Sequence, residues 1–234
     1  MPGDGRTIGN QRGEVPAYLA DTYWWAYVHP RAIYIFERQW LVNLILWGNF
    51  SRLRDAALDA LGERLPGRTL QIACVYGNLS RRLLARIEPD ASLDVVDILP
   101  LQLENLRRKL PEDPRVSAIL GDSSSLQMPS ASYDRALLFF LLHEQPEDVR
   151  RATVSEALRV VKPGGQLVIV DYHRPSRANP LHWPMRGILR TLEPYALDLW
   201  QHELEEWLPR ERQVARIEKQ TMFGGLYQML RITV

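Results

Sequence analysis

Between about residue 69 and residue 171 the apolar residues follow two patterns in turn, one typical of strands and one typical of helices. This succession predicts a sheet flanked by helices. Short apolar runs, typical of buried strands, alternate with longer segments in which apolar side chains recur every three or four residues. The order favours a parallel sheet with right-handed crossovers. The predicted strands are Leu70–Val75, Ser92–Val96, Val116–Leu120, Tyr133–Phe140 and Gln166–Asp171, and the predicted helices between them are 78–87, 100–110 and 147–161.

Helical patterns flank this alternating core on both sides. Three precede it, and the third begins at Ser51, which can cap a helix that ends at Leu61. Two more follow the core, the second over Leu197–Trp207, and two strand patterns then close the chain, which gives seven strands. We expect one domain after a mobile tail. Its expected parts are the tail 1–14, then a single domain 15–234 made of a helical cap 15–61, a nucleotide-binding core 69–171, a helical insertion 175–209 and closing strands 213–234.

The first strand, the turn after it and the next helix form the unit that cradles nucleotides in open α/β sheets. Nucleotide-binding turns usually contain three small residues. This turn has one glycine, Gly77, and it has Ala73, Val75 and Tyr76 where the three small residues usually stand. The sequence therefore predicts the frame of a nucleotide site with an altered turn.

Two acids follow later strands of the predicted core. Asp97 follows the second predicted strand, 20 residues beyond Gly77, where a carboxylate can accept both hydroxyls of a ribose. Asp122, with Ser123 after it, follows the third strand and is placed to accept a hydrogen bond from an adenine amino group. Each acid alone could instead cap a following helix. Together, in order at the carboxyl edge, they indicate a nucleoside site.

Composition removes several other classes of function. The formal net charge of +1 gives no support for nucleic acid as a partner. One cysteine, Cys74, excludes an internal disulfide, fits a reducing cytoplasm and is expected to pack inside the first strand. No apolar run reaches the roughly 18 residues of a membrane-spanning helix. Arginine pairs such as Arg150-Arg151 are expected on solvated helix faces.

Several motifs resemble those of class I S-adenosylmethionine-dependent methyltransferases, nearest to the C-methyltransferases of ubiquinone and menaquinone. They read GDSSSLQMPSASYD, KPGG, DYH and FGGLYQ. Three longer stretches are similar to the rhodoquinone-biosynthesis methyltransferase-like proteins, and they read YLADTYWWAYVHPRA, FERQWLVNLILWGNF and CVYGNLS. The resemblance covers roughly residues 15 to 234.

The resemblance implies an α/β fold, a Rossmann-like seven-stranded class I methyltransferase sheet with an antiparallel last strand, an N-terminal helical cap and a late helical insertion. It implies S-adenosylmethionine as cofactor, and the residues expected to bind it are Ala73, Val75, Tyr76, Gly77, Asp97, Ile98, Asp122 and Ser123. It further implies that ubiquinone is converted to rhodoquinone. In that reaction an amino group from S-adenosylmethionine replaces a ring methoxy group, and manganese(II) is required.

The altered turn and four residues after the fourth and fifth strands would then carry the chemistry. We expect the methionine end of the cofactor to be held in an unusual way, because Val75 does not easily adopt a positive φ and Tyr76 adds a ring. The expected metal ligands are His143, Glu144, Asp171 and His173, and the expected catalytic residues are Tyr76, His143, Glu144 and His173. Such a donor set suits manganese, which would polarise a quinone carbonyl. Without a metal, the same residues would position substrate or act as bases.

Aromatic residues outside the sheet are the candidates for substrate contact. Tyr23, Trp24 and Tyr27 in the cap, and Trp183 in the insertion, are expected to line the substrate pocket. The cap aromatics either belong to the core, cover an apolar ligand or touch a membrane surface. A long-tailed ubiquinone substrate favours a cytoplasmic protein at the inner face of the cytoplasmic membrane. Two other functions stay open, a conventional S-adenosylmethionine-dependent methyltransferase and a non-catalytic module that holds a lipid or a partner.

Overall fold

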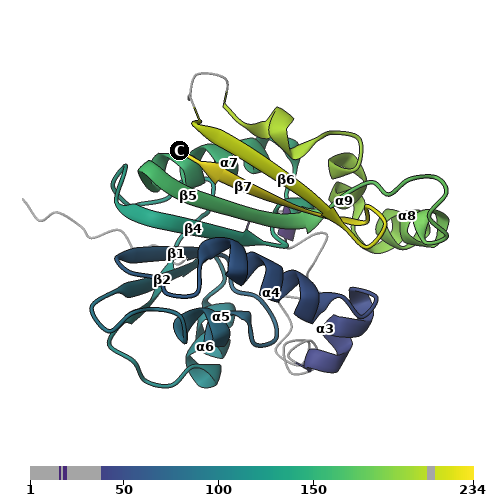
Figure 1. Ribbon diagram of the computed structural model, residues 1–234. Coiled ribbons are helices and arrows are strands. Elements are labelled where there is room, and N and C mark those ends of the chain that lie inside the picture. Colours follow the sequence, from purple (N-terminus) through teal and green to yellow (C-terminus); the bar gives the residue numbers. More distant parts are fainter. Residues whose placement is uncertain (1–15, 17, 20–37, 210–213) are drawn as a thin grey trace, which may run out of the picture.

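The computed structural model describes residues 16, 18–19, 38–209 and 214–234 of the chain. Its centre is a seven-stranded sheet in the order β3-β2-β1-β4-β5-β7-β6 (Figure 1). The strands β1 to β5 pair in parallel, and β7 runs antiparallel between β5 and β6. The strands are β1 (Arg68–Ile72), β2 (Ser92–Asp97), β3 (Val116–Leu120), β4 (Tyr133–Phe139), β5 (Val161–Tyr172), β6 (Arg216–Met222) and β7 (Tyr227–Thr233). The predicted seven-stranded Rossmann-like fold is confirmed, including its antiparallel last strand.

Helices cover both faces of the sheet because side chains alternate along the buried strands. Along β4, Leu137 and Phe139 join the apolar core beneath α4 and α5, whereas Ala136 and Leu138 join the core beneath α7. The helices are α3 (Gln39–Ile45), α4 (Phe50–Leu61), α5 (Leu79–Leu84), α6 (Pro100–Lys109), η2 (Leu142–Glu144), α7 (Glu147–Val160), α8 (His182–Leu192), α9 (Pro194–Leu199) and η3 (Leu204–Trp207). These two cores fix the carboxyl edge of the parallel strands, where ligands bind in such sheets.

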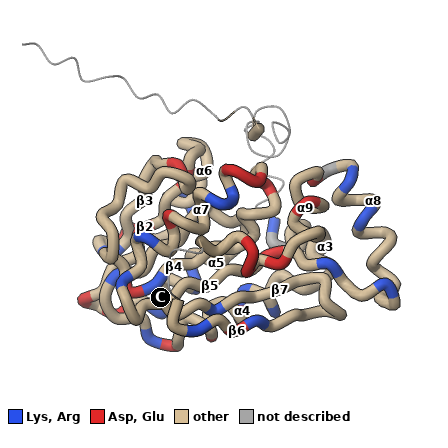
Figure 2. The backbone as a smooth tube through the Cα atoms, turned by 90° about the horizontal axis from the view of Figure 1, so that it is seen from above, with Lys and Arg blue, Asp and Glu red and all other residues tan. Residues whose placement is uncertain are grey.

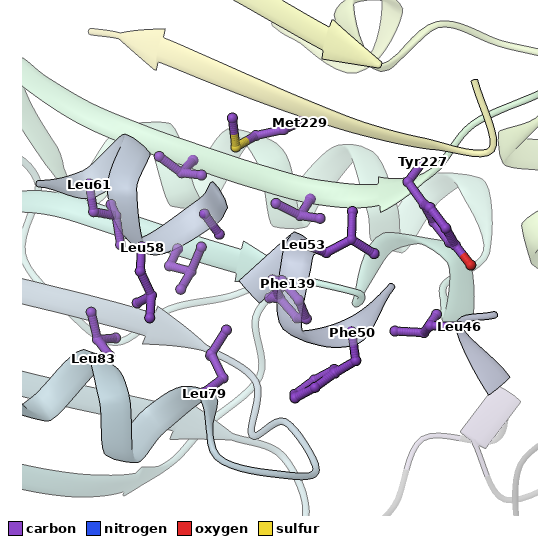
Figure 3. Packing of buried hydrophobic residues seen from close by; sticks show 14 of the residues in the cluster. Leu46, Phe50, Leu53, Leu58, Leu61, Leu79, Leu83, Phe139, Tyr227 and Met229 are labelled. Atoms are coloured by element: carbon purple, nitrogen blue, oxygen red, sulfur yellow. The ribbon is translucent and has the colours of Figure 1, made fainter. Parts of the chain in front are cut away.

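The helix α4 covers the sheet directly. Figure 3 shows Phe50, Leu53 and Leu58 of this helix close to Leu79 of α5 and to the sheet, and all four side chains are at most 1% exposed. The Phe50 ring packs edge-on against Phe139 of β4, with 6.2 Å between the ring centroids. The last part of the predicted N-terminal cap is therefore built into the main core.

Several element boundaries differ from the sequence prediction: β5 begins at Val161, five residues before the predicted start, and α5 ends at Leu84, three residues before the predicted end. Three further differences concern β1, α4 and the insertion. The strand β1 ends at Ile72, three residues before the predicted end, because the chain turns at Ala73. The helix α4 begins after Asn49, so Ser51 lies inside it and does not cap it. The second predicted helix of the insertion is two elements, α9, which starts at a proline, and η3, which starts with a capping box between Glu203 and Glu206.

Candidate cofactor and substrate site

A cavity of about 70 Å³ lies at the carboxyl edge of the sheet. Pockets for drug-sized ligands span roughly 300–1,000 Å³. The surrounding side chains must therefore move apart before a nucleoside can enter. Part of the wall is formed by Tyr18 and Leu19 of the N-terminal segment. The lining residues are Tyr18, Leu19, Ala73, Cys74, Val96, Asp97, Ile98, Leu99, Gln102, Gly121, Asp122, Ser123, Phe140, Leu141, Glu144 and Gln145.

Asp97 lines this cavity and also holds the turn after β1. Its Oδ2 accepts a hydrogen bond from the backbone N–H of Cys74 at 2.7 Å, and its Oδ1 accepts one from the N–H of Leu99 at 2.8 Å. Burial raises the pKa of the Asp97 carboxyl to about 6, and these hydrogen bonds oppose the rise. Each carboxylate oxygen keeps a second lone pair. Asp97 can therefore accept ligand hydroxyl groups while it fixes the turn.

Asp122, Ser123 and Gln145 form a second polar group in the cavity wall. Asp122 Oδ1 accepts hydrogen bonds from the backbone N–H and the hydroxyl of Ser124, at 2.8 and 2.7 Å. Gln145 Nε2 donates to Ser123 Oγ at 3.0 Å. Gln145 Oε1 is buried and accepts no hydrogen bond from the described residues. An unused acceptor in the wall of a cavity suits a ligand N–H group such as an adenine amino group.

The altered turn is only partly at the cavity. Ala73 and Cys74 line it, whereas Val75, Tyr76 and Gly77 are absent from its lining. The carbonyl of Val75 accepts a hydrogen bond from Lys109 at 2.6 Å, and the Tyr76 hydroxyl accepts one from Gln102 Nε2 at 2.8 Å, so both residues are tied to α6. The first half of the turn, Ala73 and Cys74, thus lies at the cavity, and the second half packs against α6.

Two other residues of the turn depart from the sequence expectation. Gly77 has a φ of +80°, and a Cβ atom there would lie 3.0 Å from the Phe50 ring, so the glycine serves the packing of α4. Cys74 lies beyond the end of β1, so its predicted place inside the strand is wrong, although it packs against the main core and also lines the cavity. Both differences follow from the early end of β1.

Ala73 occupies the backbone conformation that usually requires glycine, with a φ of +72°. This conformation costs an alanine about 1 kcal/mol. We expect Ala73→Gly to leave the free energy of unfolding unchanged or raise it by up to about 1 kcal/mol, because lost strain offsets the larger entropy of the unfolded chain. Ala56→Gly within α4 is the matched control and should lower it by about 1 kcal/mol. Urea denaturation compares the two, and equal losses would contradict the strained turn.

His143 lies between carboxylates next to the cavity. It is 4% exposed, with Nδ1 at 2.9 Å from Asp171 Oδ1 and Nε2 at 3.0 Å from Glu193 Oε2. Glu144 Oε1 is 3.7 Å from Nε2. Burial alone would lower the pKa of His143, but the carboxylates of Asp171 and Glu193 hold this pKa well above its ordinary value. An imidazolium carries a proton on both ring nitrogens, so it has no lone pair with which to act as a base or to bind a metal.

The four predicted metal ligands do not form one site. His173 Nδ1 lies 2.7 Å from the carbonyl of Gly225, and its Nε2 lies 3.6 Å from Glu203, away from the cluster around His143. Within the described residues, no group of three or more histidine, cysteine, aspartate or glutamate side chains is arranged to hold a metal ion. The expected manganese site therefore does not fit the arrangement of these donors.

Arg150 connects the insertion to the edge of the site. Its side chain is fully buried, so its predicted place on a solvated face is wrong. It donates to the carbonyls of Leu142, Gln145 and Tyr195 and pairs with Asp198 at 3.0 Å. Because Tyr195 and Asp198 belong to α9, this one cation fixes α9 against the segment that carries His143.

Of the four predicted substrate aromatics, Trp183 lies within the described residues, and it does not line the cavity beside Asp97. Tyr23, Trp24 and Tyr27 lie outside the described residues. Trp183 is 60% exposed and lines a different cavity beside His173. Sequence reasoning also missed several residues at the site, because their signal comes from contacts between distant segments. These are Tyr18, Gln102, Phe140, Gln145, Arg150 and Glu193.

Sequence comparisons relate this chain to methyltransferases. A family described as a methyltransferase domain matches residues 69–165. A demethylmenaquinone methyltransferase from Beutenbergia cavernae is 33% identical over 206 residues, which are 82% of this chain and 80% of that protein. A 2-methyl-6-phytyl-1,4-hydroquinone methyltransferase from Synechocystis is 32% identical over 58% of this chain. This match spans 41% of the length of the Synechocystis protein, so it covers a shared core and not that whole protein.

Solved structures agree with the fold. Phosphoethanolamine N-methyltransferase 2 from Haemonchus contortus, in complex with S-adenosyl-L-methionine, superposes with a TM-score of 0.66 over 94% of this chain and 60% of that chain, at 14% identity. An O-methyltransferase family protein from Burkholderia thailandensis has a TM-score of 0.64 over 87% of this chain and 59% of its own, at 17% identity. At these identities the likeness shows the fold alone.

Proposed function

Because the chain belongs to the class I S-adenosylmethionine-dependent methyltransferases, close to the demethylmenaquinone and ubiquinone methyltransferases, we propose that it methylates a quinone-class ring. The observation that carries the proposal is the 33% identity to a demethylmenaquinone methyltransferase across 82% of this chain. A relative named for a phytyl hydroquinone supports the same substrate class. The substrate is then a ring with oxygen substituents, in its quinol form when it is methylated.

The residues of the cavity fit the cofactor. Asp97 offers carboxylate oxygens for ribose hydroxyls, and Asp122 and Gln145 offer acceptors for an adenine amino group. Ala73 and Cys74 bring backbone close to the space left for the amino-acid end. When bound, S-adenosylmethionine supplies an electrophilic methyl group on a sulfonium.

Glu144 is the residue that we propose as the proton acceptor. Its side chain lines the cavity, whereas His143 is held between Asp171 and Glu193. A quinol ring carbon becomes a better nucleophile when a ring hydroxyl loses its proton to a positioned carboxylate. In this role His143 orients the edge of the site as a cation near Glu144, and Phe140, edge-on to His143 at 5.8 Å, forms the apolar wall for the ring.

A second candidate reaction is the amination of ubiquinone to rhodoquinone. One observation favours it, namely that the turn after β1 has Ala73 in a glycine-like conformation followed by Val75 and Tyr76. Of this turn, Ala73 and Cys74 line the cavity, and their side chains present a different surface to the amino-acid end of the cofactor than glycines would. The donors among the described residues do not fit the manganese ion that this reaction would require.

The mass of the product separates these reactions. The protein is incubated with a demethylated quinol, or with ubiquinone and manganese(II), in the presence of S-adenosylmethionine labelled with carbon-13 on the methyl group and nitrogen-15 on the amino group. We expect the labelled methyl group on the quinol ring. A Glu144→Gln variant should lose most of this turnover, by about 100-fold or more, as is typical for a lost general base. Transfer of nitrogen-15 to ubiquinone would instead support amination, and no labelled product would contradict both.

Location follows from the substrate class. Long-tailed quinones reside in bilayers, so we place the protein at the inner face of a cytoplasmic membrane. Among the described helices, none has the length and apolar character that crossing a bilayer demands. The proposed contact with the membrane is therefore made by a surface of the folded protein.

A further inference from the structure

A second and larger cavity lies outside the site described above. It has a volume of about 480 Å³ and is bounded by the loop after β5, by α8 and by the segment before η3. Positive and titratable side chains dominate its wall. They are Arg174, Arg177, Arg186, His173, His182 and His202.

The positive charge of this cavity is not compensated within the described chain. Its one carboxylate, Glu203, is already bonded to Lys219 and lies 3.6 Å from His173 Nε2. Arg174, Arg177 and Arg186 are exposed and form neither an ion pair nor a hydrogen bond with other described residues. Guanidinium groups recognise phosphate and carboxylate groups, so a concave surface with three of them suits an anion.

Large apolar side chains are exposed beside this cavity. On α8, Trp183 is 60% exposed and Ile188 is 41% exposed. On α3, Trp40 and Leu44 are 61% and 65% exposed. The two helices lie at the same end of the molecule (Figure 1), and Trp47, two residues beyond α3, donates from Nε1 to the sulfur of Met185 of α8 at 2.9 Å. Exposed apolar residues gathered at one end mark an interaction surface.

The two segments that include α3 and α8 carry basic residues and no acidic ones. Residues 38–52 and 174–192 together contain six arginines and no aspartate or glutamate, although the whole chain is nearly balanced at 29 basic and 28 acidic residues. Lysine and arginine side chains are blue in Figure 2, and α8 is marked with blue and no red. Tryptophan and aliphatic side chains flanked by arginines are the composition of surfaces that bind anionic bilayers.

We propose that this end of the protein docks on an anionic phospholipid bilayer. Arg174, Arg177 and Arg186 bind a lipid phosphate in the cavity, and the apolar face formed by Trp40, Leu44, Trp183 and Ile188 rests among the lipid headgroups. The assignment extends the proposed function, on which it rests only for the expectation that the substrate lies in a bilayer. Its test contains neither quinone nor S-adenosylmethionine, so either proposal can fail while the other stands.

Co-sedimentation with vesicles tests the assignment. We expect the full chain to bind vesicles that contain phosphatidylglycerol and to bind pure phosphatidylcholine vesicles at least tenfold more weakly. The triple variant Arg174→Gln, Arg177→Gln, Arg186→Gln should bind the anionic vesicles about 100-fold more weakly than the wild type. The matched control Arg64→Gln, Arg81→Gln, Arg107→Gln removes the same charge from exposed positions elsewhere and should lose much less. Equal losses in the two variants, or equal binding to both kinds of vesicle, would overturn the proposal.

Two further measurements test whether the site binds a membrane or a free phosphate. Trp40→Ala combined with Trp183→Ala should weaken vesicle binding about tenfold and reduce the blue shift of tryptophan fluorescence that accompanies it. Unchanged binding would overturn the apolar contact.

Inorganic phosphate and glycerol phosphate are added as competitors. If they bind to the wild type but not to the triple arginine variant, while vesicles do not bind at all, the cavity takes a free phosphate and the membrane assignment is wrong.

Discussion

Replacing Asp97 with asparagine should weaken the binding of S-adenosylhomocysteine by about 100-fold. The carboxylate lines the cavity, and each charge-assisted hydrogen bond that it accepts from a ligand hydroxyl is worth about 1.5–3 kcal/mol. Asparagine keeps one acceptor oxygen but no charge. Isothermal titration gives the affinity, and Asp90→Asn, an exposed acid outside the cavity, is the control that should bind as the wild type does.

The same carboxyl makes cofactor affinity depend on pH. Because burial raises the pKa of Asp97 to about 6, the carboxylate form is lost as pH falls through 6. Affinity should therefore be constant above pH 7 and fall by up to about tenfold for each pH unit below 6. The Asp97→Asn variant should lack this dependence. If the affinity of the variant still falls with pH, the titrating group is not Asp97.

Replacing Arg150 with methionine should lower the free energy of unfolding by about 3–5 kcal/mol. The substitution leaves Asp198 without this ion pair and removes the guanidinium hydrogen bonds to three carbonyl groups, those of Leu142, Gln145 and Tyr195, two of which are buried bonds. Urea denaturation measures the loss. The expected result is large because the buried cation and its acceptors come from segments far apart in the sequence.

Arg151→Met is the matched control for this prediction. Arg151 is the next residue in α7, and its guanidinium also lies 4.6 Å from the Trp207 ring. Its ion pair with Glu147 is exposed, however, and such pairs contribute about 0–1 kcal/mol. We expect Arg151→Met to cost no more than about 1 kcal/mol. Similar losses for the two variants would show that Arg150 does not fix the insertion.

The sheet and the acids at its edge could be predicted from the sequence because each depends on local order along the chain. The alternation of apolar strands and amphipathic helices fixes a parallel sheet, and the carboxyl ends of parallel strands meet at one edge. Asp97 is the last residue of β2 and Asp122 lies two residues beyond β3, so their meeting at one cavity needs no knowledge of distant contacts.

The remainder of the site could not be predicted because it depends on packing between distant segments. His143 meets Glu193, 50 residues away, only because Arg150 draws α9 onto the segment after β4. Strand periodicity alone does not show that Ala73 turns the chain early, which takes Cys74 out of the strand and into the cavity wall. Arginine pairs on helices usually face solvent, and the fully buried Arg150 is distinguished from Arg151 only by the helix phase and by the insertion that covers it.

The central claim is that the cavity at the carboxyl edge holds the nucleoside of S-adenosylmethionine. A crystal structure of the protein with S-adenosylhomocysteine tests it most directly. The account predicts the ribose hydroxyls at Asp97 and the adenine beside Asp122 and Gln145, with Tyr18 and Leu19 displaced to enlarge the cavity. A nucleoside bound elsewhere, with Asp97 still bonded only to Cys74 and Leu99, would contradict it.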